Sequence, residues 1–450
     1  MFRSFSSLWW PAMLFGALVC PAHAALFEGR LDNGLQVLVK EDHRSPVVVS
    51  MVWYRAGSMD ESTGTTGVAH VLEHMMFKGT TDIAPGEFSK MIARAGGRDN
   101  AFTNRDTTVY HQQLHKSQLA LALRLEADRM ANLLLPKEEF DKEIRVVMEE
   151  RRLRTEDQPR SLLYEQFMAT AYQAHPYRTP VIGWMKDLEN MTVQDARDWY
   201  RRWYTPANAT LVVVGDVDAQ EVFAEAKRWF GPIGSRPLEP RKALTEPPQR
   251  GMRRVVLRAS AELPQVMMGW HVPTLRDVEH DWEPYALWIL AAVLDGNEAA
   301  RLPRNLVREQ RIAVSANANY DAVNRGPGIF VLSATPTLGR SADEVETALR
   351  EEVRRLKEEG VTEQELQRTK VQAIATQMFQ RDSMFGQAMQ TGVLNNAGLP
   401  PDSTDLQVRK LQDISVAQVR AVARKYLVDE GLTVAMLEPQ SNNSAKQANK

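Results

Sequence analysis

Residues 67–78 read Gly-Val-Ala-His-Val-Leu-Glu-His-Met-Met-Phe-Lys and contain two histidines and a glutamate in the pattern H-x-x-E-H. Because residues three and four apart share one face of a helix, we expect His70, Glu73 and His74 to point the same way. Most of the other side chains in the stretch are apolar, which is typical of a buried helix. The stretch therefore predicts a buried helix with three chemically active side chains on one face.

Two imidazoles one helical turn apart can bind one metal ion, and a carboxylate beside them is placed to accept a proton from the metal's water. A single histidine in such a helix is more often a hydrogen-bonded core residue. Two histidines four residues apart, with an acid between them, favour a metal site, and the pattern is typical of zinc peptidases. Zinc in hydrolases usually takes three protein ligands, so a third ligand is expected elsewhere in the chain.

A second informative pattern lies in a helix predicted over residues 136–154, with Pro136 in its first turn. One stripe of this helix recurs with a period of 3.6 residues and contains Phe140, Glu143, Val146, Val147, Glu150 and Leu153. We expect the stripe to be buried, and a buried carboxylate is costly unless it is paired or bound to a metal. Glu150 is therefore a candidate third ligand, although the sequence alone does not exclude its neighbour Glu149. The flanking residues expected on a solvated face are Arg145, Glu149, Arg151 and Arg152.

The first 24 residues have the features of a secretory signal. They contain Arg3, an apolar run over residues 8–19 and the small-x-small sequence Ala22-His23-Ala24. The single cysteine, Cys20, lies in this segment, so the mature chain would have neither a disulfide nor a cysteine nucleophile. No other stretch approaches the ~20 apolar residues of a membrane helix. We expect a periplasmic protein that has no membrane association once the signal is removed.

Residues 232–251 contain five prolines and many charges, which indicates a linker. The predicted organisation is a signal peptide at 1–24, an N-terminal zinc-bearing domain at 25–231, the linker, a homologous C-terminal domain at 252–438 and a disordered tail at 439–450. The predicted fold class is α+β, with two homologous domains that each pack a mixed sheet with helices. The net charge of −2 gives no indication of nucleic-acid binding.

Strands and helices alternate in a similar order in the two halves. Strands are expected at 26–30, 35–40, 47–54, 100–103, 107–113, 209–214, 255–257, 265–271, 313–320, 328–334 and 433–437. Helices beyond the two described above are expected at 85–95, 117–135, 161–172, 193–203, 219–230, 281–294, 299–308, 341–359, 362–381 and 416–427.

From about Leu26 to Leu437 the sequence resembles the insulinase/pitrilysin family of zinc peptidases, in its short two-domain bacterial form. The resemblance rests on HVLEHMMFKGT at 70–80, GGRDNAFTNRDTTVYH at 96–111, EIRVVMEERR at 143–152 and HPYRTPVIGW at 175–184. It implies a metalloendopeptidase that hydrolyses peptides or unfolded segments within a closed chamber.

The resemblance also implies roles for individual residues. His70, His74 and Glu150 would bind one Zn²⁺ per chain, and Glu73 would be the catalytic base that activates the zinc-bound water. Glu143 would support the site from behind the ligands, where such partners orient them.

The segment Asn100, Ala101, Phe102 and Thr103 matches the family's substrate-binding edge strand. An extended peptide can add to a sheet edge through main-chain hydrogen bonds. Without the family resemblance, an ordinary hairpin strand would be the simpler interpretation.

One departure from the family pattern concerns the second half. Active members often carry an arginine, a glycine four residues later and a tyrosine seven residues later, and the arginine and tyrosine reach the substrate carbonyl. Arg308 matches, but Ile312 and Ser315 occupy the other two positions, and Tyr320 lies five residues further on. We therefore predict a heterodimer in which this chain provides the zinc and a homologous chain provides the arginine and tyrosine; a homodimer is the alternative.

Two other functions stay open. A weakly active or non-catalytic subunit for peptide binding or assembly would account for Ser315. A zinc-binding protein without peptidase function would explain neither Glu73 nor the edge strand.

Overall fold

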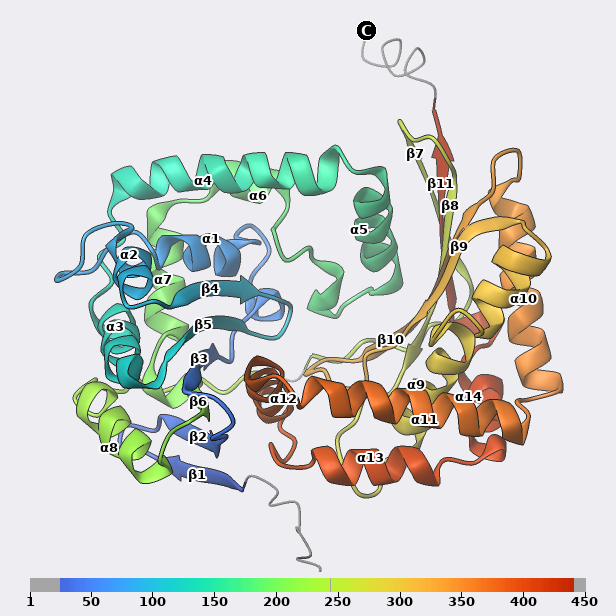
Figure 1. The fold of residues 1–450 in the computed structure, drawn as a ribbon. Coiled ribbons are helices and arrows are strands. Elements are labelled where there is room, and N and C mark those ends of the chain that lie inside the picture. Colours follow the sequence, from blue (N-terminus) through green and yellow to red (C-terminus); the bar gives the residue numbers. More distant parts are fainter. Residues whose placement is uncertain (1–24, 243, 441–450) are drawn as a thin grey trace, which may run out of the picture.

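The computed structural model describes residues 25–242 and 244–440, and it consists of two sheet-and-helix halves that lie side by side (Figure 1). The predicted signal peptide with Cys20 and residues 441–450 of the predicted tail lie outside the described residues. Within the described ranges, no helix has both the length and the apolar character needed to cross a membrane.

The first half contains a six-stranded sheet in the order β1-β2-β6-β3-β5-β4. Its strands are β1 (Leu26–Arg30), β2 (Gln36–Glu41), β3 (Val47–Tyr54), β4 (Arg98–Thr103), β5 (Thr108–His115) and β6 (Ala209–Gly215). Only β2 and β6 are parallel neighbours among these pairs. The β-branched run of β3 is buried along nearly its whole length, as expected for an inner strand. β4 is an edge strand that pairs with β5 from Arg98 opposite Gln113 to Thr103 opposite Thr108.

The helices of the first half, with the exception of α5, pack on one face of this sheet in a single hydrophobic core. They are α1 (Val68–Met75), α2 (Glu87–Arg94), α3 (Leu119–Asn132), α4 (Lys137–Arg151), α5 (Pro159–Ala171), α6 (Met185–Asn190), α7 (Val193–Trp203) and α8 (Ala219–Phe230). α4 continues into a π-helical turn, Arg152–Glu156, before α5 begins. The short α6 was not expected from the sequence.

The second half repeats this topology with a five-stranded sheet in the order β7-β11-β8-β10-β9. Its strands are β7 (Arg253–Ala259), β8 (Gln265–Val272), β9 (Ala313–Asn319), β10 (Gly328–Pro336) and β11 (Leu432–Pro439). β7 and β11 are parallel, as β2 and β6 are, and β9 occupies the edge position that β4 has in the first sheet. The equivalent strand orders confirm the predicted α+β fold with two homologous sheet-and-helix units.

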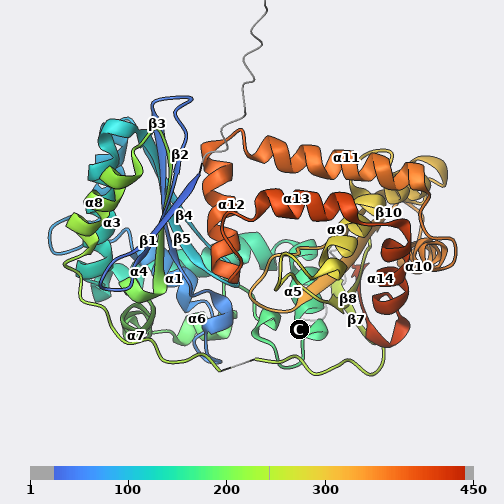
Figure 2. The same ribbon diagram turned by 90° about the horizontal axis from the view of Figure 1, so that it is seen from below.

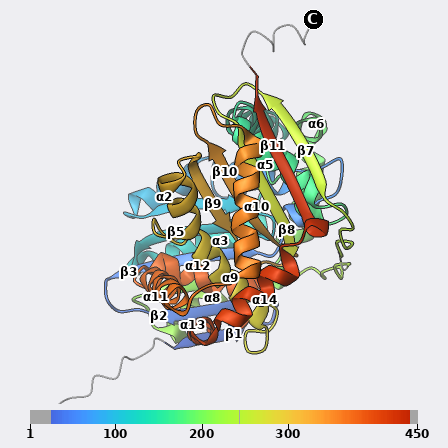
Figure 3. The same ribbon diagram turned by 90° about the vertical axis from the view of Figure 1, so that its right-hand side faces the viewer.

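The helices of the second half cover the outer face of its sheet, which α10 crosses in Figure 3. They are α9 (Trp282–Asp295), α10 (Ala342–Glu358), α11 (Glu363–Gln380), α12 (Met384–Ala397), α13 (Thr404–Asp413) and α14 (Val416–Tyr426). α12 and α13 were not expected from the sequence. Most of the helix expected at 299–308 is a π-helical segment, Pro303–Glu309.

The two halves exchange one helix each. α12 of the second half packs Met384 and Ala388 on the free face of the first sheet, against strand residues such as Val49 and Val212. α5 of the first half packs Phe167 and neighbouring apolar side chains on the inner face of the second sheet. Figures 1 and 2 show both helices between the sheets. Each half therefore supplies part of the other half's core.

Candidate metal centre

Helix α1 begins at a tight turn that a buried carboxylate stabilises. Gly67 precedes the helix with φ of 89°, a left-handed conformation that glycine adopts without strain. The Glu61 carboxylate accepts hydrogen bonds from the backbone N–H groups of Gly67 (2.8 Å) and Ala69 (2.9 Å). Burial raises the pKa of Glu61 to about 8. Glu61 thus fixes the start of the helix that carries the H-x-x-E-H motif, a role the sequence did not indicate.

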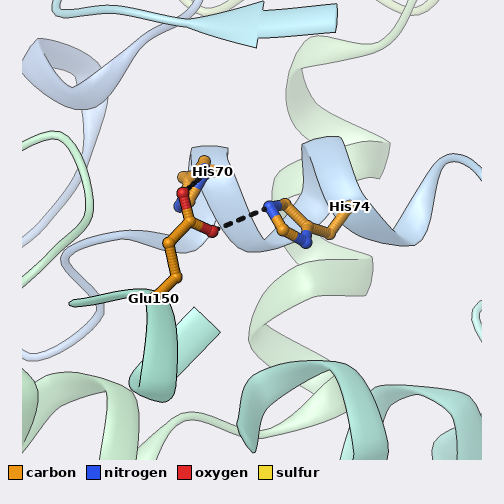
Figure 4. Close-up of side chains that lie close together, drawn as sticks. All are labelled: His70, His74 and Glu150. Atoms are coloured by element: carbon orange, nitrogen blue, oxygen red, sulfur yellow. Dashed lines mark ion pairs between the residues drawn. The ribbon is translucent and has the colours of Figure 1, made fainter. Parts of the chain in front are cut away.

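The structure brings together the three residues that the sequence predicts as metal ligands (Figure 4). One ligand atom each from His70, His74 and Glu150 lies within 4.8 Å of the others. Nε2 of His74 is 3.5 Å from Oε2 of Glu150, and Nε2 of His70 is 3.9 Å from Oε1. Glu149, the alternative third ligand, is exposed and pairs with Arg152 instead.

The side chains of this group fit a zinc ion chemically. Two imidazoles and a carboxylate are a common catalytic zinc donor set. Burial, together with the nearby charges of His74 and Arg154, lowers the pKa of His70 to about 3, so the ring is neutral, as a ligand must be. Nδ1 of His70 is also buried and has no hydrogen-bond partner among the described residues. In the structure the Glu150 charge is balanced by an ion pair with Arg154.

Glu143 lies behind His74 and orients its ring. Its Oε1 is 2.9 Å from Nδ1 of His74, and its Oε2 is 2.6 Å from Nζ of Lys78. Burial lowers the pKa of His74, but the hydrogen bond with Glu143 and the charges of Glu150 and Glu73 outweigh it and raise that pKa. The hydrogen bond between Glu143 and Nδ1 leaves Nε2 of His74 directed at Glu150.

Glu73 projects from the same face of α1 toward the edge strand β4. The Thr103 hydroxyl donates a hydrogen bond of 2.5 Å to Oε2 of Glu73. Burial raises the pKa of Glu73, and the hydrogen bond from Thr103 opposes part of that shift. A carboxylate with a raised pKa is a better general base near neutral pH.

Glu73 and two members of the three-residue group, His70 and Glu150, line a cavity of about 610 Å³. Ala101, Phe102 and Thr103 of the predicted substrate strand line it, together with residues of α5 and of the segment 178–182. Asn100 is exposed, does not line the cavity, and accepts the Ala101 N–H through its own side chain (2.9 Å). Three of the four predicted strand residues thus line the same cavity as Glu73.

Two expectations about helix α4 are wrong. Val146 and Leu153 were expected to be buried but are 50% and 58% exposed. They lie to one side of the buried face of the helix, which contains Phe140 and Val147. Arg151 was expected on a solvated face but is only 4% exposed. The buried face of the helix instead includes Phe140, Val147 and Arg151. These residues are seven and four positions apart, so they lie on the same side of the helix.

Arg308 is not placed at this site. It is exposed near the end of the π-helical segment, and every cavity-lining residue among those described lies between residues 70 and 182. Ser315 lies on the edge strand β9, and the Tyr320 hydroxyl donates to the carbonyl of Pro273 (2.6 Å). None of these three residues lines the cavity beside Glu73.

Comparison with family models finds two matches that together cover most of the chain. Residues 36–183 match the model described as "Insulinase (Peptidase family M16)", and residues 190–372 match the one described as "Peptidase M16 inactive domain". The first match contains the H-x-x-E-H helix and the predicted third ligand; the second begins just before α7.

Similar proteins extend over nearly the whole length. The chain is 33% identical to the zinc protease PqqE of Helicobacter pylori, over 91% of this chain and 92% of that protein. It is 24% identical to the uncharacterized zinc protease YmxG of Bacillus subtilis, over 91% and 97%.

Among solved structures, a protease from Helicobacter pylori superposes with a TM-score of 0.88 at 31% identity, over 93% of this chain and 100% of that one. The periplasmic protease PqqL of Escherichia coli gives a TM-score of 0.79 at 19% identity, over 94% of this chain but 48% of that one.

Proposed function

The chain belongs to the insulinase family, peptidase family M16, and from that membership we propose that it is a zinc-dependent endopeptidase acting on peptides or unfolded segments. The observation that carries the proposal is the convergence of His70, His74 and Glu150 within 4.8 Å, beside a cavity that His70, Glu150 and Glu73 line. The zinc-protease names of its relatives support the same metal.

In this proposal His70, His74 and Glu150 hold the Zn²⁺, and Glu143 keeps His74 in its ligating orientation. A bound Zn²⁺ supplies Lewis acidity toward water and a peptide carbonyl. Glu73 accepts a proton from the attacking water on a carboxylate oxygen and later delivers it to the leaving amine nitrogen. Thr103 holds the carboxylate of Glu73 during both transfers through its hydroxyl.

The substrate would bind as an added strand along β4. Among the described strands β4 pairs only with β5, so its outer main-chain groups are available to an extended peptide. Ala101 and Phe102 would then lie beside the peptide, and Thr103 would place its scissile bond next to Glu73.

We further propose that a homologous chain completes the site. The second half of this chain contributes no lining residue among those described, and Ser315 replaces the tyrosine of the family pattern. The match of this chain to about half of PqqL, a chain roughly twice as long, supports a pairing of two such units, and its periplasmic location supports an exported protein. If no partner restores activity, a peptide-binding subunit is the function that the same observation favours.

The experiment compares the zinc-loaded wild type with Glu73→Gln and with the matched control Glu149→Gln, each with and without a homologous chain that carries the arginine and tyrosine. Glu73→Gln should keep about one zinc per chain and lose ~10²–10⁴-fold in peptide turnover. Glu149→Gln should keep both the zinc content and the peptide turnover of the wild type, because Glu149 is exposed. A wild type that binds zinc and peptides but hydrolyses none under either condition rejects the endopeptidase; ordinary turnover by the isolated chain rejects the need for a partner.

A further inference from the structure

The cavity beside the metal group carries an excess of positive charge. Its charged side chains, apart from His70, are the arginines Arg105, Arg154, Arg160 and Arg178 and the carboxylates Glu73, Glu150 and Glu165. Glu165 is engaged by the buried Arg151 through two hydrogen bonds of 2.8 and 3.0 Å. Glu150 faces the two histidines and pairs with Arg154. Arg105, Arg160 and Arg178 therefore have no carboxylate partner on the cavity wall.

Arg105 is the best positioned of these three arginines. Its Nε–H donates to the carbonyl of Tyr177 (3.3 Å), and its guanidinium lies 5.7 Å from the ring centroid of Tyr164 and 5.8 Å from that of Tyr177. Its two terminal nitrogens make no hydrogen bond to a described residue, so they are free to bind a ligand. These contacts hold a half-buried guanidinium at the cavity and reduce the entropy that the arginine side chain would lose when it binds an acidic group.

Arg160 approaches the same cavity from the first turn of α5. It is exposed, and within the described part of the chain it has neither a hydrogen bond nor an ion pair. Arg178 is also exposed, but its Nη1 donates to the carbonyl of Gln173 (2.9 Å). The uncharged part of the wall includes the apolar side chains Phe102, Met168 and Ile182, which can contact the methylene groups of a bound side chain.

We propose that this cavity selects peptides with an acidic side chain close to the scissile bond, and that Arg105 and Arg160 determine this specificity. The inference rests on the proposed function, since it names the substrate class of the same site. A guanidinium binds a carboxylate through paired hydrogen bonds that a neutral amide cannot fully replace, and a lysine or arginine side chain is repelled. Partial enclosure by the cavity walls strengthens both effects over those at an open surface.

The test uses fluorescein-labelled peptides of one length that differ only in having Glu, Gln or Lys at one position, placed in turn on each side of the scissile bond. Binding to the full-length Glu73→Gln protein is measured by fluorescence anisotropy, and kcat/KM is measured with zinc-loaded wild type and its partner chain. At one position we expect Glu to be preferred over Gln by about tenfold, equivalent to about 1.4 kcal/mol, and over Lys by more.

Variants on the Glu73→Gln background assign the preference to residues. Arg105→Gln with Arg160→Gln should reduce the Glu-to-Gln affinity ratio to near one. The control Arg145→Gln, an exposed arginine on α4 that does not line the cavity, should preserve the ratio. If the double variant does not fold, the exposed Arg160→Gln alone should still lower the ratio about threefold, equivalent to ~0.65 kcal/mol.

Each outcome separates the inference from the function on which it rests. Peptides that are cleaved and bound with equal affinity, whether they carry Glu, Gln or Lys, overturn the inference and leave the endopeptidase intact. An equal loss of preference in Arg145→Gln overturns the assignment to the cavity and indicates an effect of net charge. Failure of every peptide to bind and to be cleaved overturns both proposals.

Discussion

Glu143 contacts two side chains at the proposed zinc site, and its replacement should lower the affinity for zinc before it affects other properties. It hydrogen-bonds Nδ1 of His74 at 2.9 Å and pairs with Lys78 at 2.6 Å. Glu143→Gln removes the charge that orients and polarises the imidazole, so the zinc affinity should fall ~10–100-fold. Competition with a chromogenic chelator measures this loss. Glu149→Gln, which is on the same helix but exposed, is the control. An equal loss of zinc affinity in this variant would show that the net charge of α4, and not the contact between Glu143 and His74, determines the zinc affinity.

Replacing Thr103 should lower peptide turnover without changing the amount of zinc bound. Its hydroxyl is the hydrogen-bond donor to Oε2 of Glu73, and Thr103→Val removes that donor while keeping the side-chain shape. Without it the carboxylate loses its fixed orientation, and we expect kcat to fall ~10–100-fold with the zinc content unchanged, by analogy with other positioned acid–base groups. Thr103→Ser, which restores the hydroxyl, should recover most of the activity. A variant that raises KM alone would show that Thr103 contacts only the substrate.

At the level of single residues, the sequence predicted that His70 and His74 lie together because one helical turn is a local pattern, whereas the choice of Glu150 over Glu149 also needed the family resemblance. Glu61 and the Thr103–Glu73 hydrogen bond were not predicted, since each joins elements whose approach depends on tertiary packing. Arg151 was placed on the wrong face because a charged side chain is ordinarily solvated, and its buried partner Glu165 lies on another helix.

Among the elements, the junction of α4 and α5 depends on one buried ion pair. Arg151 binds Glu165 at 2.8 Å and donates to the carbonyl of Gly183 at 2.9 Å, which ties α4 to α5 and to the segment before α6. Arg151→Met leaves Glu165 buried and unpaired and should cost about 3–5 kcal/mol of stability. Its neighbour Arg152 pairs with Glu149 at an exposed position, so Arg152→Met should cost less than ~1 kcal/mol.

Denaturant titrations followed by tryptophan fluorescence compare the two arginine variants. The shift of the unfolding midpoint should be several times larger for Arg151→Met than for Arg152→Met. Equal shifts would mean that the junction is held by apolar packing, because the two substitutions remove the same charge from adjacent positions. A loss of proposed peptidase activity in Arg151→Met is also expected, since Glu150 precedes Arg151 on the helix.

The helices that the sequence predicted correctly have an apolar stripe and clear ends. α7 and α8 begin and end at the expected residues, and each has a side-chain cap, from Thr192 and Asp218 respectively. α12 escaped prediction because its buried positions include Gln387, Thr391 and Gly392, so its apolar period is broken. Those residues fit a surface that belongs to the other half of the molecule, which a local pattern does not reveal.

For the whole molecule, the proline-rich segment 232–251 divides the chain, yet the cores cross that division. α5 completes the second sheet and α12 completes the first. Polar contacts join the same surfaces: the Gln387 amide donates to Asp42 (2.8 Å), and Arg325 binds Asp60 (2.8 Å). We therefore expect the two halves to depend on each other for stability.

A glycine faces an aromatic ring at each of the two places where a helix of one half packs on the sheet of the other half. A Cβ added at Gly392 of α12 would overlap the indole of Trp53 in β3, and one added at Gly269 of β8 would overlap the ring of Phe167 in α5. Gly392→Ala should therefore cost about 1–3 kcal/mol through overpacking, although alanine is otherwise the better helix former. Gly269→Ala should have a similar effect at the second contact. Gly234→Ala, where an added Cβ meets nothing within 4 Å, is the control.

The same denaturant titration, with hydrogen exchange to locate the effect, distinguishes coupled halves from independent ones. With coupled halves, Gly392→Ala lowers the unfolding midpoint and weakens protection in β3 and β6 as well as in α12, because the displaced helix uncovers the first sheet. Two results would show that α12 does not stabilise the first sheet. One is a loss of hydrogen-exchange protection in the second half alone. The other is a shift of the unfolding midpoint in Gly392→Ala no larger than that in Gly234→Ala. The exposed face of that sheet would then need another cover, since Val49, Met51 and Val212 cannot remain in water without cost.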